Sequence, residues 1–157
     1  MQHSKTVVGL ISDTHGLLRP QAIDALRGSD LIIHAGDIGK LEVIDQLRTV
    51  APTMAVRGNV DVGGWAEQFP ATEAVKVGEL TFWVLHEISQ LDFGTAAAGL
   101  AAVVYGHSHQ PSLETRAGLL YINPGSAGPR RFKLPVTVAR VSVTGRQIHP
   151  EIINLDV

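Results

Sequence analysis

The first 57 residues alternate short apolar runs with amphipathic segments, and this order constrains the fold more than any other feature of the chain. The runs at 6–12, 31–35 and 53–57 are too short for helices, which predicts buried strands. Helical patterns lie between them at 20–28, which runs from a proline to a glycine, and at 41–48. Strands that alternate with helices of this length form a mainly parallel sheet with helices on its faces.

The rest of the chain changes to hairpins. Three pairs of strands are each joined by a turn that contains glycine, at 73–77 and 80–86, 113–116 and 119–123, and 136–143 and 146–153. The alanine-rich segment 94–102 predicts a helix broken at Gly99, and a strand follows at 103–105. A length of 157 residues suits one domain. We therefore expect residues 1–157 to form a single α/β domain in which two sheets pack together under outer helices.

Composition excludes several classes of protein. With 45% hydrophobic and 18% charged residues, the chain can bury a core and is not disordered. Its 13 Lys and Arg against 15 Asp and Glu give a net charge of −2, which disfavours nucleic acid as a partner held by overall charge. Cysteine is absent, so a metal site would use only nitrogen and oxygen ligands.

Targeting signals and membrane spans are not evident in the sequence. No apolar run approaches the roughly 18 residues that a membrane helix needs. The first six residues are polar and do not lead into the apolar region of a signal peptide. We therefore expect a cytoplasmic protein without a membrane partner.

Polar side chains follow the predicted strands, at the edge where ligands bind to open α/β sheets. They supply two carboxylates, one amide oxygen and four imidazoles, and they are Asp13, His15, Asp37, Asn59, His86, His107 and His109. The pairs Asp-x-His and His-x-His point to one side of an extended backbone and can share a centre. Seven ligands exceed the needs of one tetrahedral ion and suit two ions that share a carboxylate.

Each of these signals is weak by itself. Asp37 alone would be explained as a helix cap, Asn59 as a turn residue and His86 as a core histidine. The glycines before them, Gly36 and Gly58, fit either a turn or a close backbone approach. The joint placement of five such segments at strand ends is what favours a metal site.

At these residues the sequence resembles the calcineurin-like metallophosphoesterases, in particular the small YfcE-like phosphodiesterases. The matching segments occur in the family's order over nearly the whole chain, and they are 12–16 (SDTHG), 34–37 (HAGD), 57–61 (RGNVD), His86, 106–109 (GHSH) and 123–126 (NPGS). The resemblance implies a four-layer α/β/β/α sandwich of two mixed sheets flanked by helices. It also implies a binuclear centre, in which one ion is held by Asp13, His15 and His109, the other by Asn59, His86 and His107, and Asp37 bridges the two.

The same resemblance implies a metal-dependent phosphodiesterase that acts on a small phosphodiester. Two divalent ions would activate a bridging hydroxide for in-line attack on phosphorus, with Asp37 at the hydroxide site and Asn59 as the second catalytic residue. Manganese is the expected metal, because the resemblance implies the metal that is usual in this family. Iron, zinc, cobalt and nickel suit the same nitrogen and oxygen ligands.

Two residues depart from the family pattern. Val60 replaces a histidine that many relatives carry after the metal-binding asparagine, and valine cannot protonate a leaving group. We therefore expect a preference for diesters or activated esters over monoesters. Glu87 stands where relatives often have glycine. Its carboxylate is either solvated, or it narrows the site and repels a second anionic group.

Several further residues are candidates for positioning the ligands or contacting the substrate. We expect His34 to be a packed residue or a partner of a ligand, and Asp61 to be either an orienting group for Asn59 or His107 or an ordinary turn acid. Asn123 and Ser126 are expected to shape a loop near the metals. The adjacent arginines 130 and 131 could reach a phosphate, although such pairs are usually solvated.

Two other functions remain open alternatives. The retromer complex has a subunit of this fold that serves mainly as a scaffold, so the chain could be a protein-interaction module; loss of metal-site histidines would favour that role. A sheet protein with histidines at its turns and no metal is the other alternative. The oligomeric state is also open, because the apolar C-terminal strands of the chain either pair across a homo-oligomer or complete the second sheet.

Overall fold

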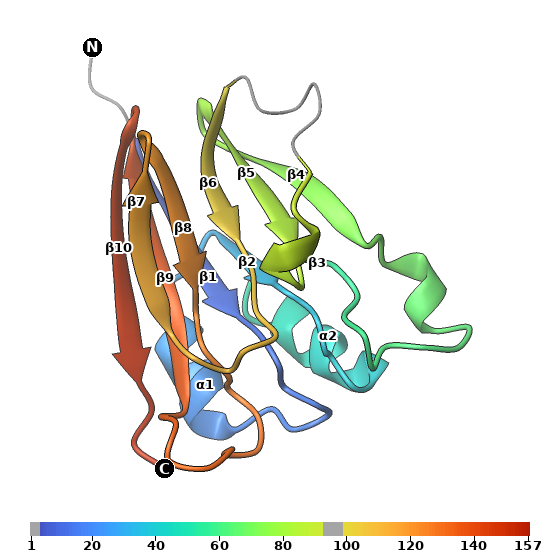
Figure 1. The fold of residues 1–157 in the computed structure, drawn as a ribbon. Helices are drawn as coiled ribbons and strands as arrows, with labels where there is room; N and C mark the ends of the chain where they lie inside the picture. The colour runs from blue at the N-terminus through green and yellow to red at the C-terminus, as the bar shows by residue number, and fades with distance from the viewer. Residues whose placement is uncertain (1–3, 93–98) are drawn as a thin grey trace.

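Two five-stranded mixed sheets pack face to face in the computed structural model, which describes residues 4–92 and 99–157 (Figure 1). In the first sheet the strand order is β10-β9-β1-β2-β3. Its members are β1 (Lys5–Ile11), β2 (Leu31–His34), β3 (Thr53–Ala55), β9 (Thr137–Thr144) and β10 (Gln147–Asn154). The strands β1, β2 and β3 are parallel, whereas β9 and β10 add antiparallel strands to the β1 edge.

The second sheet combines two hairpins in the order β4-β5-β6-β8-β7. Its members are β4 (Thr72–Val77), β5 (Leu80–Leu85), β6 (Leu100–Val104), β7 (Ser112–Arg116) and β8 (Leu119–Asn123). The hairpins β4–β5 and β7–β8 are antiparallel, and β6 lies between them, parallel to both of its neighbours. The predicted hairpins and the two mixed sheets are therefore confirmed. The expectation that the C-terminal strands complete the second sheet is wrong, because β9 pairs with β1 and so adds the hairpin β9–β10 to the first sheet.

Helices cover the outer face of the first sheet. The helices α1 (Pro20–Leu26) and α2 (Leu41–Arg48) begin and end close to the predicted positions, and Leu26, Ile44 and Leu47 pack against that sheet. On the outer face of the second sheet, the described residues contribute the 3-10 turn η2 (Ile88–Gln90), and a further turn, η1 (Ala66–Gln68), precedes β4. No helix in residues 4–92 or 99–157 is long and apolar enough to cross a membrane.

The main core lies between the two sheets, where side chains alternate inward along each strand. Leu10 and Val141 from the first sheet meet Phe82, Val104 and Ile122 from the second, and all five are almost fully buried. Alternation with period two places the opposite faces of these strands against the helices or toward solvent. This double burial fixes the register of both sheets, and with it the position of the loops at their ends.

One predicted helix is wrong where the structure describes it. The segment 100–102, expected to end an alanine-rich helix, instead begins β6, and the predicted strand 103–105 starts three residues earlier. Ala102 pairs with Phe82 of β5 and Leu120 of β8. Pairing with a strand on each side therefore outweighs the helix preference of alanine. The rest of that prediction, residues 94–98, lies outside the described residues.

Candidate metal centre

The seven predicted ligands come from loops that follow strands of both sheets. Five of them have left-handed backbone angles, with φ of 54° at Asp13, 47° at His15, 55° at Asp37, 75° at His107 and 64° at His109. In the described part of the chain these are five of the seven non-glycine residues with positive φ. Such angles cost about 1 to 3 kcal/mol each and persist where the surrounding structure imposes them. The strain is therefore concentrated in the predicted site.

One group of ligand atoms consists of Asp13, His15 and His109, all within 4.8 Å of one another. The Nε2 atoms of His109 and His15 lie 3.3 Å and 3.9 Å from Asp13 Oδ1. Asp13 Oδ2 accepts hydrogen bonds from the Ser12 hydroxyl at 2.7 Å and from the His107 main-chain N–H at 3.1 Å. These bonds leave Oδ1 directed at the histidines.

The second group consists of Asp37, His86 and His107. His86 Nδ1 lies 2.8 Å from the carbonyl oxygen of Ala35, so it donates its proton there. Its Nε2 then faces Asp37 Oδ2 at 3.2 Å. A histidine that is oriented by a carbonyl at one ring nitrogen presents the lone pair of the other nitrogen to a metal.

Asp37 lies between the two groups. Its Oδ2 is 3.6 Å from His15 Nε2 of the first group and 3.2 Å from His86 Nε2 of the second. Glycine is required opposite it, because a Cβ on Gly58 would collide with the main-chain nitrogen and carboxylate of Asp37. This close approach brings the loop that carries Asn59 against Asp37.

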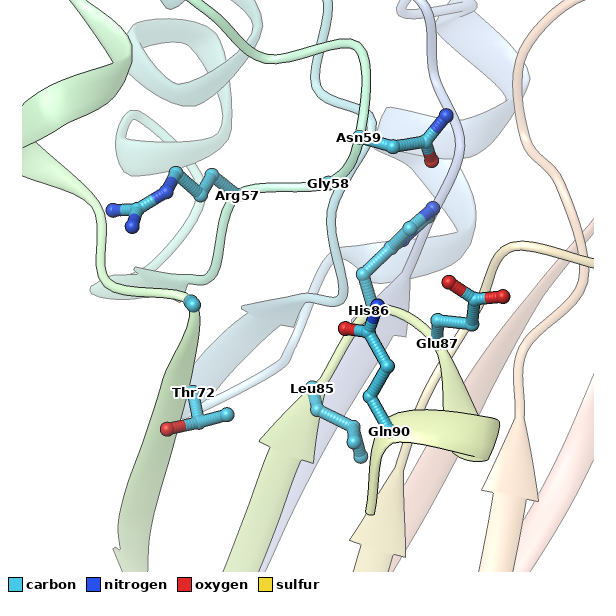
Figure 2. A pocket seen from close by; sticks show the side chains of 9 residues that line it. Arg57, Gly58, Asn59, Thr72, Leu85, His86, Glu87 and Gln90 are labelled. Atoms are coloured by element: carbon cyan, nitrogen blue, oxygen red, sulfur yellow. The ribbon is translucent and has the colours of Figure 1, made fainter. Parts of the chain in front are cut away.

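Asn59 and His86 line a cavity of about 250 Å³ next to the second group. Figure 2 shows the Asn59 amide and the His86 ring pointing toward the same part of the site, with the Glu87 carboxylate beside them and Arg57 directed away. Glu87 Oε1 is 3.6 Å from His107 Nε2, and its side chain is 35% exposed. Its carboxylate is therefore at the cavity wall and is not simply a solvated surface charge.

Unpaired buried atoms show that these residues suit metal ions. Within residues 4–92 and 99–157, Asp13 Oδ1, His15 Nε2 and His86 Nε2 are buried and have no hydrogen-bond partner. Buried polar atoms are normally paired, and these three face one another across the centre. Carboxylate and imidazole donors match divalent transition metals, so ligation would satisfy all three.

Charge on the carboxylates is stabilised even without a metal. Burial would raise the pKa of Asp13 and Asp37, but contacts with histidine outweigh it, so both pKa values are lowered. His109 and His86 act on Asp13, and His86 and the Val60 main-chain N–H act on Asp37. Burial lowers the pKa of His86, yet Asp37 and Asp13 raise it overall. A divalent ion would take the place of the histidine protons.

Both ring nitrogens of His34 are engaged in hydrogen bonds within the protein. Its Nδ1 accepts the N–H of Gly36 at 3.0 Å, so Nε2 carries the proton and donates it to Thr14 Oγ1 at 2.9 Å. Thr14 in turn donates to the Ile38 carbonyl at 2.8 Å. This chain connects the loop of Asp13 to the loop of Asp37, in agreement with the expected role of His34 as a packed partner.

Burial of His34 makes stability depend on pH. Desolvation lowers its pKa from 6.5 to about 4, so its contribution is complete above pH 6.5 and is lost as the pH falls through 4. We expect His34 to contribute about 3 kcal/mol to the unfolding free energy that metal-free protein loses in this window. Urea unfolding should show that His34→Gln loses less unfolding free energy than the wild type over this pH range. His149→Gln, which changes an exposed histidine, should lose as much as the wild type. Equal pH dependence in all three proteins would contradict this assignment.

Three other predicted residues connect the loops of the site. Asp61 accepts main-chain N–H groups from Gly58, Ile38 and Gly39 at 2.8 to 3.0 Å. It therefore holds the loop of Asn59, one of its two expected targets, and does not contact His107. Asn123 donates to the Gly106 carbonyl and to Ser108, and Ser126 donates to the Asp13 carbonyl. Both side chains are buried, and their hydrogen bonds join loops of the site.

Sequence reasoning assigned no role to Ser12 or Thr14, although their hydroxyl groups orient Asp13 and connect to His34. The available signal was their position on either side of Asp13. Short hydroxyl side chains beside a candidate ligand commonly bond to it or to nearby backbone.

Comparison with known proteins identifies the family of this chain. A sequence model of the calcineurin-like phosphoesterase superfamily domain matches residues 7–146. The chain belongs to the calcineurin-like phosphoesterase superfamily. A probable metallophosphoesterase of Methanothermobacter thermautotrophicus is 30% identical and aligns with 94% of this chain and 92% of its own. A phosphodiesterase of Methanocaldococcus jannaschii, MJ0936, is 28% identical over 75% of this chain and 82% of its own.

Solved structures share the fold of this chain. An archaeal phosphodiesterase superposes with a TM-score of 0.76 at 24% identity, covering 94% of this chain and all of the other. YfcE of E. coli, a phosphoesterase, superposes with a TM-score of 0.66 at 22% identity, covering 96% of this chain and all of the other. Vacuolar protein sorting 29 of Cryptosporidium parvum superposes with a TM-score of 0.75 at 16% identity, covering 96% of this chain and 98% of the other. These matches cover 94 to 96% of the chain and show that it shares their fold.

Proposed function

We propose that the chain is a metal-dependent phosphodiesterase with a binuclear centre. One ion would be held by Asp13, His15 and His109, the other by Asn59, His86 and His107, with Asp37 shared between them. The observation that carries this proposal is the pair of ligand groups that meet at Asp37 and contain unpaired buried atoms. Manganese is the proposed metal.

The ions would supply positive charge that lowers the pKa of water and neutralises phosphoryl oxygens. The residues of the chain provide the position of that charge. Asp37, fixed through its Oδ1 by the Val60 N–H at 3.1 Å, orients the two groups relative to each other. Asn59 adds a neutral amide at the wall of the cavity, where it can donate to a phosphoryl oxygen.

Diesters are the proposed substrates in preference to monoesters. The side chain of Val60 has no proton to give to a poor leaving group, and it is 43% exposed. A monoester is a dianion at neutral pH, and the Glu87 carboxylate at the cavity wall opposes the extra charge. A diester carries one negative charge and meets less repulsion.

A non-catalytic scaffold remains the alternative, and the likeness to vacuolar protein sorting 29 is the observation that favours it. That likeness is one of fold, at 16 to 20% identity. The complete set of ligand residues favours catalysis over the scaffold.

Metal reconstitution tests the proposal. Protein stripped with a chelator and reloaded with Mn²⁺ should bind two ions per chain by elemental analysis. It should then hydrolyse bis(p-nitrophenyl) phosphate with a kcat/KM about 10²-fold or more above that for p-nitrophenyl phosphate. Fe²⁺, Zn²⁺, Co²⁺ and Ni²⁺ serve as comparison ions. Two bound ions without hydrolysis would support the scaffold, and a preference for the monoester would contradict the diester proposal.

A further inference from the structure

A second cavity adjoins the candidate metal centre on the side of the first ligand group. Its volume is about 290 Å³, and it is lined by His15, His109, Pro129, Arg130 and Arg131. It shares no lining residue with the cavity of Figure 2, which opens beside His86 and Asn59. Each ligand group therefore has a cavity of its own, as two substituents of one phosphodiester would require.

The two cavities differ in charge. The one in Figure 2 contains the Glu87 carboxylate, and the guanidinium of Arg57 there donates to the Phe69 carbonyl at 2.6 Å. No carboxylate of the described residues lines the second cavity, which has two guanidinium groups. Arginine at a cavity wall favours phosphate through paired, charge-assisted hydrogen bonds. A second anionic group of the substrate is therefore accepted on the arginine side and opposed on the Glu87 side.

Both arginines are available to a ligand. Arg130 donates to a main-chain oxygen of Val157 at 3.2 Å, and in the described part of the chain neither arginine forms an ion pair with a carboxylate side chain. Both side chains lie in an exposed segment, so a phosphate can reach them. The described carboxylate side chains therefore leave both guanidinium groups free to pair with a phosphate.

The next residue, Phe132, adds an exposed aromatic ring to the same segment. It is 88% exposed and has a φ of 54°, so the chain presents a bulky apolar side chain to solvent on strained backbone. Lys133 follows and is also exposed. Proteins bind single-stranded nucleic acids with this combination of groups, because an exposed aromatic ring stacks on a base and nearby cations contact phosphates.

We propose that Arg130 and Arg131 form an anion subsite for a second phosphate of a nucleotidic phosphodiester, with Phe132 as the stacking surface for a base. The proposal rests on the phosphodiesterase function above and names its substrate class as short single-stranded oligonucleotides. The net charge of −2 is consistent with it, because recognition by one loop needs local charge and no basic surface over the whole protein.

Terminal phosphorylation of a dinucleotide tests the subsite in turnover. With the Mn²⁺-loaded enzyme, thymidylyl-thymidine carrying a 5′- or a 3′-phosphate should be cleaved with a kcat/KM at least about tenfold above that of the unphosphorylated dinucleotide. In Arg131→Ala this ratio should fall to about one. Arg146→Ala is the matched control: Arg146 is an exposed arginine where β9 turns into β10, at the far end of β9 from residues 129–133, and should keep the ratio.

Binding supplies a readout that does not depend on turnover. By isothermal titration calorimetry, thymidine 3′,5′-bisphosphate should bind the wild type about tenfold more tightly than thymidine 5′-monophosphate. Arg130→Ala and Arg131→Ala should lose this difference, whereas Arg146→Ala keeps it. Phe132→Ala should weaken both nucleotides by a similar factor, because stacking does not depend on the second phosphate.

The outcomes separate the subsite from the proposed function. Equal rates with and without the terminal phosphate, together with equal binding of the two nucleotides, would overturn the subsite and leave phosphodiesterase activity standing. Absence of hydrolysis of every diester would reject the proposed function, while the calorimetry would still decide whether the arginines bind the second phosphate. Sedimentation with phosphatidylserine vesicles that depends on Phe132 and Arg131, without nucleotide preference, would overturn the proposal in favour of a membrane surface.

Discussion

Asp37→Asn is expected to lower kcat/KM for bis(p-nitrophenyl) phosphate by about 10³-fold or more, because a lost ion removes several kcal/mol of charge stabilisation. Asparagine has nearly the same shape, and its amide oxygen can still accept the Val60 N–H that now binds Oδ1 of Asp37. It removes the negative charge at the atom that faces both His15 and His86. The loss should therefore be one of metal binding and not of folding.

Elemental analysis is the decisive measurement for this variant. The wild type should hold two ions per chain, and Asp37→Asn at most one. Asp45→Asn is the matched control, since Asp45 is an exposed carboxylate on α2. An Asp37→Asn protein with two ions and an unchanged rate would show that this carboxylate is not shared between the metals.

Asp61→Ala should lower both stability and activity. The carboxylate accepts three main-chain N–H groups, from Gly58, Ile38 and Gly39, and is 3% exposed. Loss of all three hydrogen bonds should cost about 3 kcal/mol of unfolding free energy, because buried donors are left unpaired. It should also lower kcat/KM by about 10²-fold, because the loops of Asp37 and Asn59 are no longer fixed to each other.

Asp61→Asn gives the graded comparison. One amide oxygen can keep the two bonds made by Oδ2, to Ile38 and Gly58, and loses the bond to Gly39. Its stability and kcat/KM should therefore lie between those of the wild type and Asp61→Ala. Urea unfolding of metal-free protein and kinetics of the reloaded enzyme provide the two measurements. A change in stability with no change in kcat/KM in either variant would reject the positioning role.

Much of the architecture could be predicted because local signals and burial agree. The hairpin at Ala117-Gly118 formed where the turn residues indicated it, since both adopt positive φ, at 51° and 79°. The start of β6 could not be predicted in the same way. Alanine favours a helix by itself, and only the two strands on either side of Ala102 change that preference.

Part of the candidate site could be predicted from the sequence and part could not. The ligand residues were visible in the sequence because each follows a strand and carries recognisable chemistry. Their supporting contacts were not, because they join residues that are far apart in the chain. Thr14 and His34 are 20 residues apart, Ile38 and Asp61 are 23 apart, and Ser126 bonds to the Asp13 carbonyl across 113 residues. Such pairings become apparent only when the loops of both sheets meet.

The left-handed backbone at five of the proposed ligands implies a conflict between stability and metal binding. Angles of this kind are unfavourable in the metal-free fold, so the protein retains them at the expense of its own stability. The benefit appears only when a cation arrives, because the ligand atoms then need little rearrangement. Selection for stability alone would replace these residues with glycine or asparagine and relax the loops. Five such residues in one centre are therefore a cost to the metal-free fold that is offset only when a cation binds.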